Sequence, residues 1–308
     1  MMNNIMIDEI NKLKKKHNAI ILAHYYQIPE IQAIADMVGD SFGLSKECAE
    51  TDADVIVFCG VKFMAESAKI LSPQKTVILP NMDAGCPMAD MVTADDVIEL
   101  RKKYPEAAFV CYVNTSAEVK AECDVCCTSS NAVNIVNSLK EKQIVFLPDK
   151  NLGRYVANQV KDKEVITIDG YCIVHNRIAA DEVLDIKMQY PEAPFLVHPE
   201  CTEEVVRLAD FVGSTAQILK RANKLSDKTI IIGTEEGILH KLKEQNPDKT
   251  FIVASSNFIC RNMKKTTLQD LLNSLNGLDE GDTEKVIELD EKVILRAKAS
   301  LERMIELG

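Results

Sequence analysis

The sequence predicts an α/β protein of three similar α/β/α lobes with parallel sheets, related by pseudo-threefold symmetry, with the active site at their centre. Internal repetition is the first observation behind this prediction. The stretch ADMVGDS at 35–41 recurs as ADFVGST at 209–215, and PQKTVILPNMDAGC at 73–86 recurs as PDKTFIVASSNFIC at 247–260, each 174 residues later. A more diverged copy, CDVCCTSS at 123–130, lies 88 residues after the first. Repeats of this kind indicate the architecture before any single motif is considered.

Alternation of apolar runs with helical stretches is the second observation. Short β-rich runs occur three times in each copy, and continuous apolar strands between helices are typical of parallel sheets covered on both faces. The runs lie at 19–23, 55–58 and 76–79, then at 107–113, 144–147 and 165–168, and finally at 195–197, 229–232 and 250–253. Helices are expected between them, for example at 42–50, 132–142 and 217–224.

Helix signals predict the lobe boundaries. An amphipathic helix pattern fills the first twenty residues, and KYPEA and QYPEA, near 103–106 and 189–192, are typical helix stops. A C-terminal helix is expected from about residue 283 to residue 306. We therefore predict lobes at 1–103, 104–189 and 190–282, with residues 283–308 packing on them as the terminal helix.

Composition excludes several classes of function. Of the 308 residues, 36 are Lys or Arg and 47 are Asp or Glu, which gives a net charge of −11. This balance, without a basic block, argues against general binding to nucleic acids or anionic membranes. No apolar run approaches the roughly 18–20 residues that span a bilayer, and the N-terminal segment lacks the apolar core of a signal peptide. A soluble, cytoplasmic protein is therefore expected.

Ten cysteines in such a chain favour metal binding or catalysis over disulfides. Cys86, Cys172 and Cys260 each follow the third strand of a lobe, at intervals of 86 and 88 residues, so their thiolates should meet at one point. They suit a four-iron cluster with one open iron, which we favour, although a zinc ion completed by histidine or water fits the spacing almost as well. The others, including those of the CDVCC motif, are expected to pack in the interior: Cys48, Cys59, Cys111, Cys123, Cys126, Cys127 and Cys201.

Polar side chains recur at equivalent places after the first strand of each copy. One set directly follows the apolar strand, and a second set lies two residues further on. The first set is His24, Tyr112 and His198, and the second is Tyr26, Asn114 and Glu200. Because ligands gather at the carboxyl ends of parallel strands, these side chains are candidates for the shared site. His175 follows Cys172 by three residues and is close enough to reach the same centre.

Two further sets of residues recur in all three copies. Ser41, Ser129 and Thr215 precede helices, where a hydroxyl either caps the helix or helps its free N–H groups to bind an anion. Because three copies face one axis, we favour anion binding. The aspartates of the second set are expected to satisfy backbone groups at a buried turn; they are Asp36, Asp124 and Asp210.

Taken together, these residues resemble the quinolinate synthase family, iron–sulfur enzymes of NAD biosynthesis with three lobes and one cysteine in each. The similar stretches run from about residue 20 to 263, nearly the whole chain, and as a set they are specific. They are AHYYQIPEIQAIAD (23–36), GDS (39–41), VIVFCGVKFMAESAKIL (55–71), YVN (112–114), TSSNAV (128–133), PDKNL (148–152), CIVH (172–175), HPEC (198–201) and GST (213–215). The chain departs from the family pattern at Gln217, where a glycine is usual.

The resemblance implies condensation of iminoaspartate with dihydroxyacetone phosphate, followed by loss of phosphate and water to give quinolinate. It implies one 4Fe–4S cluster per chain, held by Cys86, Cys172 and Cys260, with one open iron acting as a Lewis acid. The implied acid–base residues are Tyr26, Glu200, His198 and His24. The implied substrate contacts are His24, Ser41, Tyr112, Asn114, Ser129, His175, His198, Glu200, Ser214 and Thr215. Iminoaspartate would come from an L-aspartate oxidase or dehydrogenase.

Other protein classes share part of this pattern. The three-lobed 4Fe–4S reductase of isoprenoid synthesis also uses one cysteine per lobe, but it requires an electron donor and has neither AHYYQ nor HPEC as a motif. A non-catalytic, zinc-stabilised binding protein would be colourless and would tolerate air. An iron–sulfur sensor would need an output module, for which three lobes leave no room.

Overall fold

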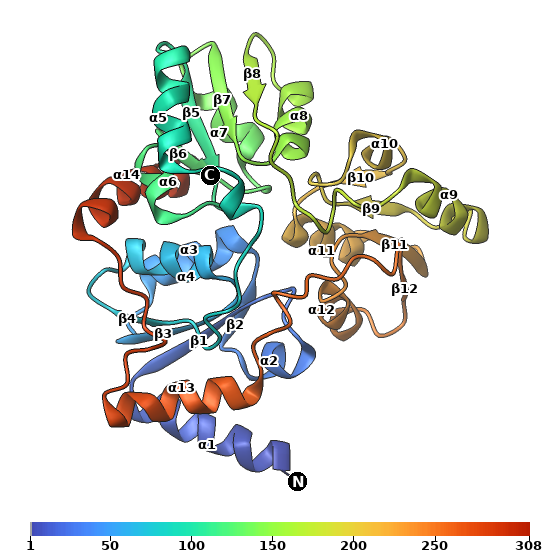
Figure 1. The fold of residues 1–308 in the computed structure, drawn as a ribbon. Helices are drawn as coiled ribbons and strands as arrows, with labels where there is room; N and C mark the ends of the chain where they lie inside the picture. Colours follow the sequence, from blue (N-terminus) through green and yellow to red (C-terminus); the bar gives the residue numbers. More distant parts are fainter. Residues whose placement is uncertain (1) are drawn as a thin grey trace.

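Three separate parallel sheets form the framework of the computed structural model, which describes residues 2–308 (Figure 1). Each sheet has four strands in the order second, first, third, fourth, so the predicted fold class is confirmed. The sheets are β1 Ala19–His24, β2 Met37–Gly39, β3 Val55–Cys59 and β4 Thr76–Ile78; β5 Ala108–Tyr112, β6 Val125–Cys127, β7 Gln143–Leu147 and β8 Glu164–Thr167; and β9 Phe195–Val197, β10 Phe211–Val212, β11 Thr229–Gly233 and β12 Thr250–Val253. The sequence prediction missed β2, β6 and β10, because strands of two or three residues produce no apolar run.

Helices flank the sheets on both faces. They are α1 Met2–Lys16, α2 Pro29–Ile34, α3 Ser41–Glu50, α4 Lys62–Leu71, the short 3₁₀ helix η1 Ala89–Met91, α5 Ala94–Lys103, α6 Ala117–Ala121, α7 Ala132–Ser138, α8 Lys150–Gln159, α9 Ala180–Gln189, α10 Glu203–Val206, α11 Thr215–Lys224, α12 Ile238–Gln245, α13 Leu268–Glu280 and α14 Glu291–Leu307. Local signals start several of them. Thr93 opens α5 and Thr267 opens α13, each in a reciprocal capping box with the aspartate three residues later.

The repeated aspartates hold the first two strands of every lobe together. The Oδ2 atom of each aspartate accepts the backbone N–H of a first-strand residue fifteen positions earlier: Asp36 from Ile21 at 2.8 Å, Asp124 from Phe109 at 2.7 Å and Asp210 from Phe195 at 2.8 Å. The backbone N–H of the aspartate returns a hydrogen bond to the same residue. The expectation that these carboxylates satisfy backbone groups at a turn is therefore confirmed, but the turns are not buried, because Asp36 and Asp210 are exposed and Asp124 is half-buried.

The same aspartates show which helix belongs to which lobe. Each forms an ion pair with a cation on the helix that precedes its lobe: Lys14 on α1 with Asp36, Arg101 on α5 with Asp124, and Lys187 on α9 with Asp210. Helices α5 and α9 therefore pack on the second and third lobes, whereas the predicted boundaries assigned them to the first and second. The predicted starts at 104 and 190 fall after these helices, because a helix stop marks the end of an element and not the end of a lobe.

The C-terminal part of the chain corrects two further expectations. Helix α13 lies in the range assigned to the third lobe, 190–282, but Leu271 and Leu275 pack with Ile10 of α1 and Ile21 of β1, on one face of the first sheet. Figure 1 shows α13 alongside α1, far from the third sheet. The final helix begins at Glu291, not near 283, because residues before it run along the edge of β4, where Ile287 N–H donates to Val77 O at 2.8 Å.

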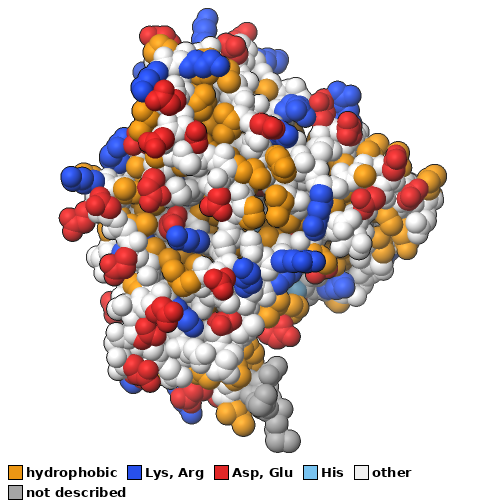
Figure 2. Space-filling model, in the orientation of Figure 1, with side chains coloured by type: hydrophobic (Ala, Val, Ile, Leu, Met, Phe, Trp, Pro, Cys, Tyr) orange, Lys and Arg blue, Asp and Glu red, His pale blue; other side chains and the backbone are white. Residues whose placement is uncertain are grey.

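Helix α14 then packs between the first two lobes, against α4, α6 and β6. Its buried residues Ala297, Leu301 and Met304 join the largest hydrophobic cluster, which spans both sheets. On the outer surface, Lys and Arg side chains are interspersed with Asp and Glu over the face drawn in Figure 2, without a large area of one sign. Among the described residues, no helix combines the length and the apolar character needed to cross a bilayer.

Candidate active site

A cavity of about 520 Å³ lies where the carboxyl ends of the three sheets converge. Thirteen of the fourteen predicted site residues line it: His24, Tyr26, Ser41, Cys86, Tyr112, Asn114, Ser129, Cys172, His175, His198, Glu200, Thr215 and Cys260. Ser214 does not line it, because this buried residue is the N-cap of α11, where its hydroxyl accepts from Gln217 N–H at 3.3 Å. The repeat positions thus bring residues from three lobes to one cavity.

Solvent exposure separates the ten cysteines into the same two groups as the repeat does, three at the centre and seven in the interior. Cys86, Cys172 and Cys260 are the three that are not fully buried, and all three line the cavity. The other seven are buried; in the CDVCC motif, Cys126 lies in β6 with its sulfur 3.5 Å from that of Cys111 and 3.3 Å from the Ser300 hydroxyl. Burial raises the pKa of Cys86 to about 12 and raises that of the other two cavity cysteines. A thiolate at these positions therefore needs a positive partner.

Two buried carboxylates hold the loops that carry cavity cysteines. Asp149, at the end of β7, accepts the N–H of Cys172 at 2.9 Å, and Glu235, after β11, accepts the N–H of Cys260 at 3.1 Å. Both carboxylate side chains are fully buried. The equivalent position in the first lobe is Val61, so this support is absent there.

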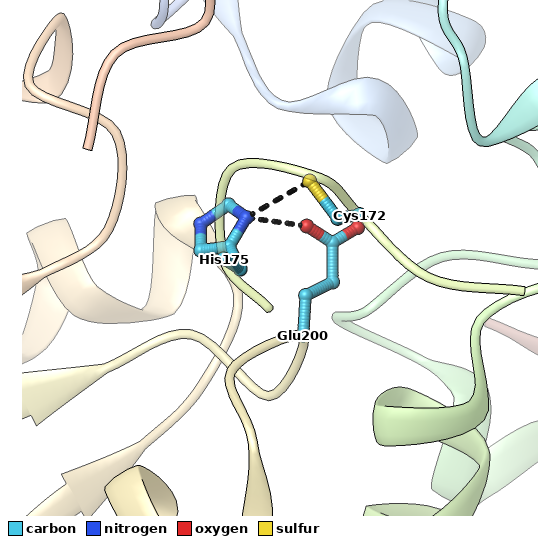
Figure 3. Close-up of side chains that lie close together, drawn as sticks. All are labelled: Cys172, His175 and Glu200. Atoms are coloured by element: carbon cyan, nitrogen blue, oxygen red, sulfur yellow. Dashed lines mark hydrogen bonds and ion pairs between the residues drawn. The ribbon is translucent and has the colours of Figure 1, made fainter. Parts of the chain in front are cut away.

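Figure 3 shows the closest group of possible ligand atoms, on Cys172, His175 and Glu200. Nδ1 of His175 lies 2.8 Å from Oε2 of Glu200 and 3.3 Å from Sγ of Cys172. Among the described residues, this is the one trio of His, Cys, Asp or Glu whose ligand atoms lie within 4.8 Å of one another. The three cavity cysteines do not form such a trio, so their sulfur atoms are spread more widely around the cavity.

Backbone hydrogen bonds define the tautomers of two cavity histidines. Nδ1 of His24 accepts the N–H of Tyr26 at 3.1 Å, and Nδ1 of His198 accepts the N–H of Glu200 at 3.3 Å, the same arrangement in two lobes. An accepting Nδ1 places the proton of a neutral imidazole on Nε2. Nε2 of His198 lies 3.1 Å from the Ser129 hydroxyl, to which it can therefore donate.

A chain of hydrogen bonds connects Glu200 to Tyr26 across the cavity wall. It starts at the 2.8 Å contact between Glu200 and Nδ1 of His175. Nε2 of His175 lies 3.0 Å from the hydroxyl of Thr234, which lies 2.7 Å from the phenol of Tyr26. The same phenol lies 2.7 Å from the Thr215 hydroxyl. Carboxylate, imidazole, hydroxyl and phenol thus form one path along which a proton can be redistributed.

Burial and local charge set the protonation of these groups. Burial, followed by the charge of Glu200, raises the pKa of Tyr26 and Tyr112 well above the usual value, so both phenols keep their protons. Burial lowers the pKa of His24 and of His198 to about 3, so both imidazoles are neutral. Burial opposes the ionisation of Glu200, but the hydrogen bonds that its carboxylate receives from His175 and Tyr112 outweigh burial and lower its pKa. The site therefore pairs one carboxylate base with protonated phenols.

Two helices present hydroxyls at their N-termini to the cavity. Asp40 caps α3 through a hydrogen bond from Gly43 N–H, and Ser214 caps α11, so the capping role falls on the residues before Ser41 and Thr215. Helix capping was the alternative to anion binding for Ser41 and Thr215, and neither residue is the N-cap of its helix. The amide oxygen of Asn114 is buried and has no hydrogen-bond partner among the residues that the structure describes, and Asn114 also lines the cavity. Its orphaned acceptor is suited to a ligand that donates a proton.

The sequence prediction missed two residues of this site, Thr234 and Lys264, and the role of Glu235 in holding the loop of Cys260. Thr234 is equivalent to Gly60 in the first copy of the repeat and to Pro148 in the second. Of these three residues only Thr234 carries a hydroxyl, and its place at a strand end was the signal from which it could have been found. Lys264 lies outside the repeat and forms an ion pair with Glu235 at 2.9 Å. No periodic pattern identifies it.

The Thr234 hydroxyl gives a testable prediction. Replacing Thr234 with valine removes the oxygen between His175 and Tyr26 while keeping the shape, so we expect turnover to fall by about 10²-fold, a typical loss for one proton-transfer group. Thr234→Ser, which keeps the oxygen, should retain activity within several-fold. Steady-state rates of both variants, at equal metal content, measure the effect. Equal rates for the valine variant and the wild type would show that no proton passes through Thr234.

Known proteins match the chain over nearly its whole length. The family model described as quinolinate synthetase A protein matches residues 8–306. A protein of Alkaliphilus metalliredigens named quinolinate synthase is 55% identical over 302 residues, covering 98% of both chains. Proteins of the same name from Caldicellulosiruptor saccharolyticus and Clostridium perfringens are 56% and 54% identical, covering 97% and 98% of both chains.

Proposed function

Because the chain belongs to the quinolinate synthetase A family, we propose that it condenses iminoaspartate with dihydroxyacetone phosphate and eliminates phosphate and water to give quinolinate. Membership of the family makes it an enzyme that forms quinolinate by condensation and dehydration, in NAD biosynthesis. The observation that carries the proposal for this chain is the central cavity, which is lined both by one partly exposed cysteine from each lobe and by residues of the hydrogen-bonded chain from Glu200 to Tyr26.

The donor set fits a 4Fe–4S cluster better than a zinc ion. A zinc ion bound by three thiolates at about 2.3 Å would bring their sulfur atoms to within about 3.8 Å of one another. The sulfur atoms of Cys86, Cys172 and Cys260 do not gather within 4.8 Å. A cluster distributes its thiolates over different iron atoms and so requires a wider spread. We therefore propose that these three cysteines hold one cluster per chain, with one open iron.

The cluster, when bound, would act as a Lewis acid at its open iron, polarising a substrate oxygen without electron transfer. The chain's own residues would do the remaining work. Glu200, kept ionised by hydrogen bonds from His175 and Tyr112, is placed to accept a proton from the condensing substrates. Tyr26 and Tyr112, held protonated by burial, are placed to donate protons to departing oxygen atoms.

Neutral donors would hold the two anionic substrates. Both substrates carry negative charge, and the chain as a whole has a net charge of −11. The N-termini of α3 and α11 supply partial positive charge and free N–H groups beside Ser41 and Thr215. The Nε2 protons of His24 and His198, fixed by the accepting Nδ1 atoms, would donate to carboxylate or phosphate oxygens, with Ser129 and Asn114 beside them.

The two alternative functions differ in what they require. A three-lobed reductase would consume electrons, whereas the proposed condensation and dehydration need no external oxidant or reductant. The relatives that match the chain over 97–99% of its length bear the name quinolinate synthase, which does not favour the reductase or a non-catalytic metal protein. Iminoaspartate would reach the enzyme from an aspartate-oxidising enzyme of either the oxidase or the dehydrogenase class.

Metal analysis of protein reconstituted without oxygen tests the cofactor proposal. We expect about four iron atoms and four sulfide ions per chain, with a brown colour that bleaches in air. One zinc ion per chain, no sulfide and no colour would contradict the cluster assignment. Because the measurement is independent of turnover, it separates the identity of the cofactor from the identity of the substrates.

A further inference from the structure

A network of hydrogen bonds links the loop of Cys260, in the third lobe, to the loop of Tyr26, in the first. The carboxylate of Glu235 is fully buried, and its Oε1 accepts the N–H of Cys260 at 3.1 Å. The same Oε1 lies 2.9 Å from Nζ of Lys264, which also donates to the main-chain oxygen of Tyr26 at 2.7 Å. One ammonium group therefore joins the carboxylate that holds the Cys260 loop to the main chain of the Tyr26 loop.

Neighbouring contacts make this junction tight. Oε2 of Glu235 accepts the N–H of Gly237 at 2.7 Å, and the buried amide of Gln32 donates to the main-chain oxygens of Tyr25 and Gly237 at 2.9 Å each. A Cβ atom on Gly237 would lie 2.7 Å from the Cα of Tyr26 and 2.8 Å from Nζ of Lys264. Such distances leave no room for a side chain, so the two lobes meet through their main chains at this point.

The ion pair sets the third lobe apart from the other two. Asp149, the equivalent carboxylate of the second lobe, holds Cys172 N–H and Leu152 N–H, and no lysine or arginine of the described chain lies within 4.0 Å of its oxygens. The first lobe has Val61 at this position. A carboxylate is thus enough to hold a cysteine loop, and the additional cation serves the contact with Tyr26.

We propose that Lys264 and Glu235 are positioning residues that couple the seating of Cys260 to the placement of the Tyr26 phenol. The proposal rests on the function proposed above, in which Cys260 binds the cluster and Tyr26 donates a proton. When Cys260 is held in place, its N–H orients the carboxylate of Glu235. That carboxylate orients the ammonium group of Lys264, which in turn holds the main-chain oxygen of Tyr26. Its phenol then reaches Thr215 and Thr234 in the hydrogen-bonded chain.

Lys264→Met, which keeps the length of the side chain but removes its charge, tests the proposal. A displacement of the order of 1 Å at Tyr26 is expected to lower kcat by about 10²-fold, with KM changed much less, because the substrate contacts remain. Lys264→Arg, which restores a cation that donates to both oxygens, should recover most of the rate. Lys228→Met, which breaks the exposed ion pair with Asp248, is the matched control and should behave as wild type.

Hydrogen exchange supplies a readout that does not depend on activity. Amide exchange in the peptide 24–34, followed by mass spectrometry, should be faster in Lys264→Met than in wild type, and iron loading should slow it in wild type only. Glu235→Gln, which keeps the shape and loses the charge, should shift exchange in the same direction even if the methionine variant folds poorly. Wild-type kcat together with wild-type exchange at 24–34 in both variants would overturn the proposal. Amide exchange at 24–34 can be compared between the variants and the wild type in protein without iron. A failure of this proposal can therefore be distinguished from a failure of the proposed function, which is measured by quinolinate formation.

Discussion

Replacement of Cys172 by alanine is expected to eliminate both bound iron and quinolinate formation. This cysteine is one of the three that face the central cavity, and its loop is held by Asp149. A cluster with one open iron depends on all three protein thiolates, so the loss of one leaves two irons without a protein ligand. Iron and sulfide content after anaerobic reconstitution measures the first effect, and a quinolinate assay measures the second. Cys86→Ala and Cys260→Ala should give the same result.

Cys126→Ala is the matched control for the cysteine series. This residue belongs to the CDVCC motif, which looks like a metal site in the sequence, but its side chain is fully buried in β6 against Cys111 and Ser300. Its removal should leave about four irons per chain and near-normal turnover, with some loss of stability from the small cavity. Loss of iron in the Cys126 variant, or a normal iron content in the Cys172 variant, would contradict the ligand assignment.

The second large effect is expected for Glu200→Gln. The amide keeps the shape of the carboxylate but cannot accept a proton, so turnover should fall by about 10²–10⁴-fold, the range for a general base. Iron content should be unchanged, because Glu200 is not among the proposed ligands. The hydrogen bond from Nδ1 of His175 can still be made to the amide oxygen, so the cavity should keep its shape.

Glu203→Gln is the control for this substitution, made on the same segment of the third lobe. Glu203 is partly exposed and pairs with Arg154 and Arg207, away from the cavity lining. It should retain nearly full activity. Turnover by Glu200→Gln at a rate close to that of wild type would remove Glu200 from the proton-transfer role, whatever its burial.

The repeat made much of this molecule predictable from its sequence. Three copies of strand, polar residue and cysteine were enough to predict three parallel sheets and to place Cys86, Cys172 and Cys260 around one cavity, because equivalent positions in equivalent folds point to the same axis. The role of Asp36, Asp124 and Asp210 was predictable for the same reason. Each lies in the equivalent turn of its own lobe and accepts a hydrogen bond from the first strand of that lobe.

Features that depend on contacts outside the repeat were not predictable. Helix α13 returns from the third lobe to cover the first sheet, and an amphipathic pattern states which face of a helix is buried but not which sheet it meets. The contacts of α5 and α9 were not predictable for a related reason, since each helix forms an ion pair with an aspartate of the sheet that follows it. Thr234 and Lys264 gain their significance from neighbours more than fifty residues away in sequence, His175 and Tyr26.

The most direct test of the proposed function is to supply iminoaspartate and dihydroxyacetone phosphate, without oxygen, to protein that carries about four irons per chain, and to measure quinolinate and phosphate together. We expect quinolinate formation with one phosphate released for each molecule formed, in the absence of any electron donor. Iron-loaded protein that forms no quinolinate, or that forms a product only when a reductant is added, would contradict it.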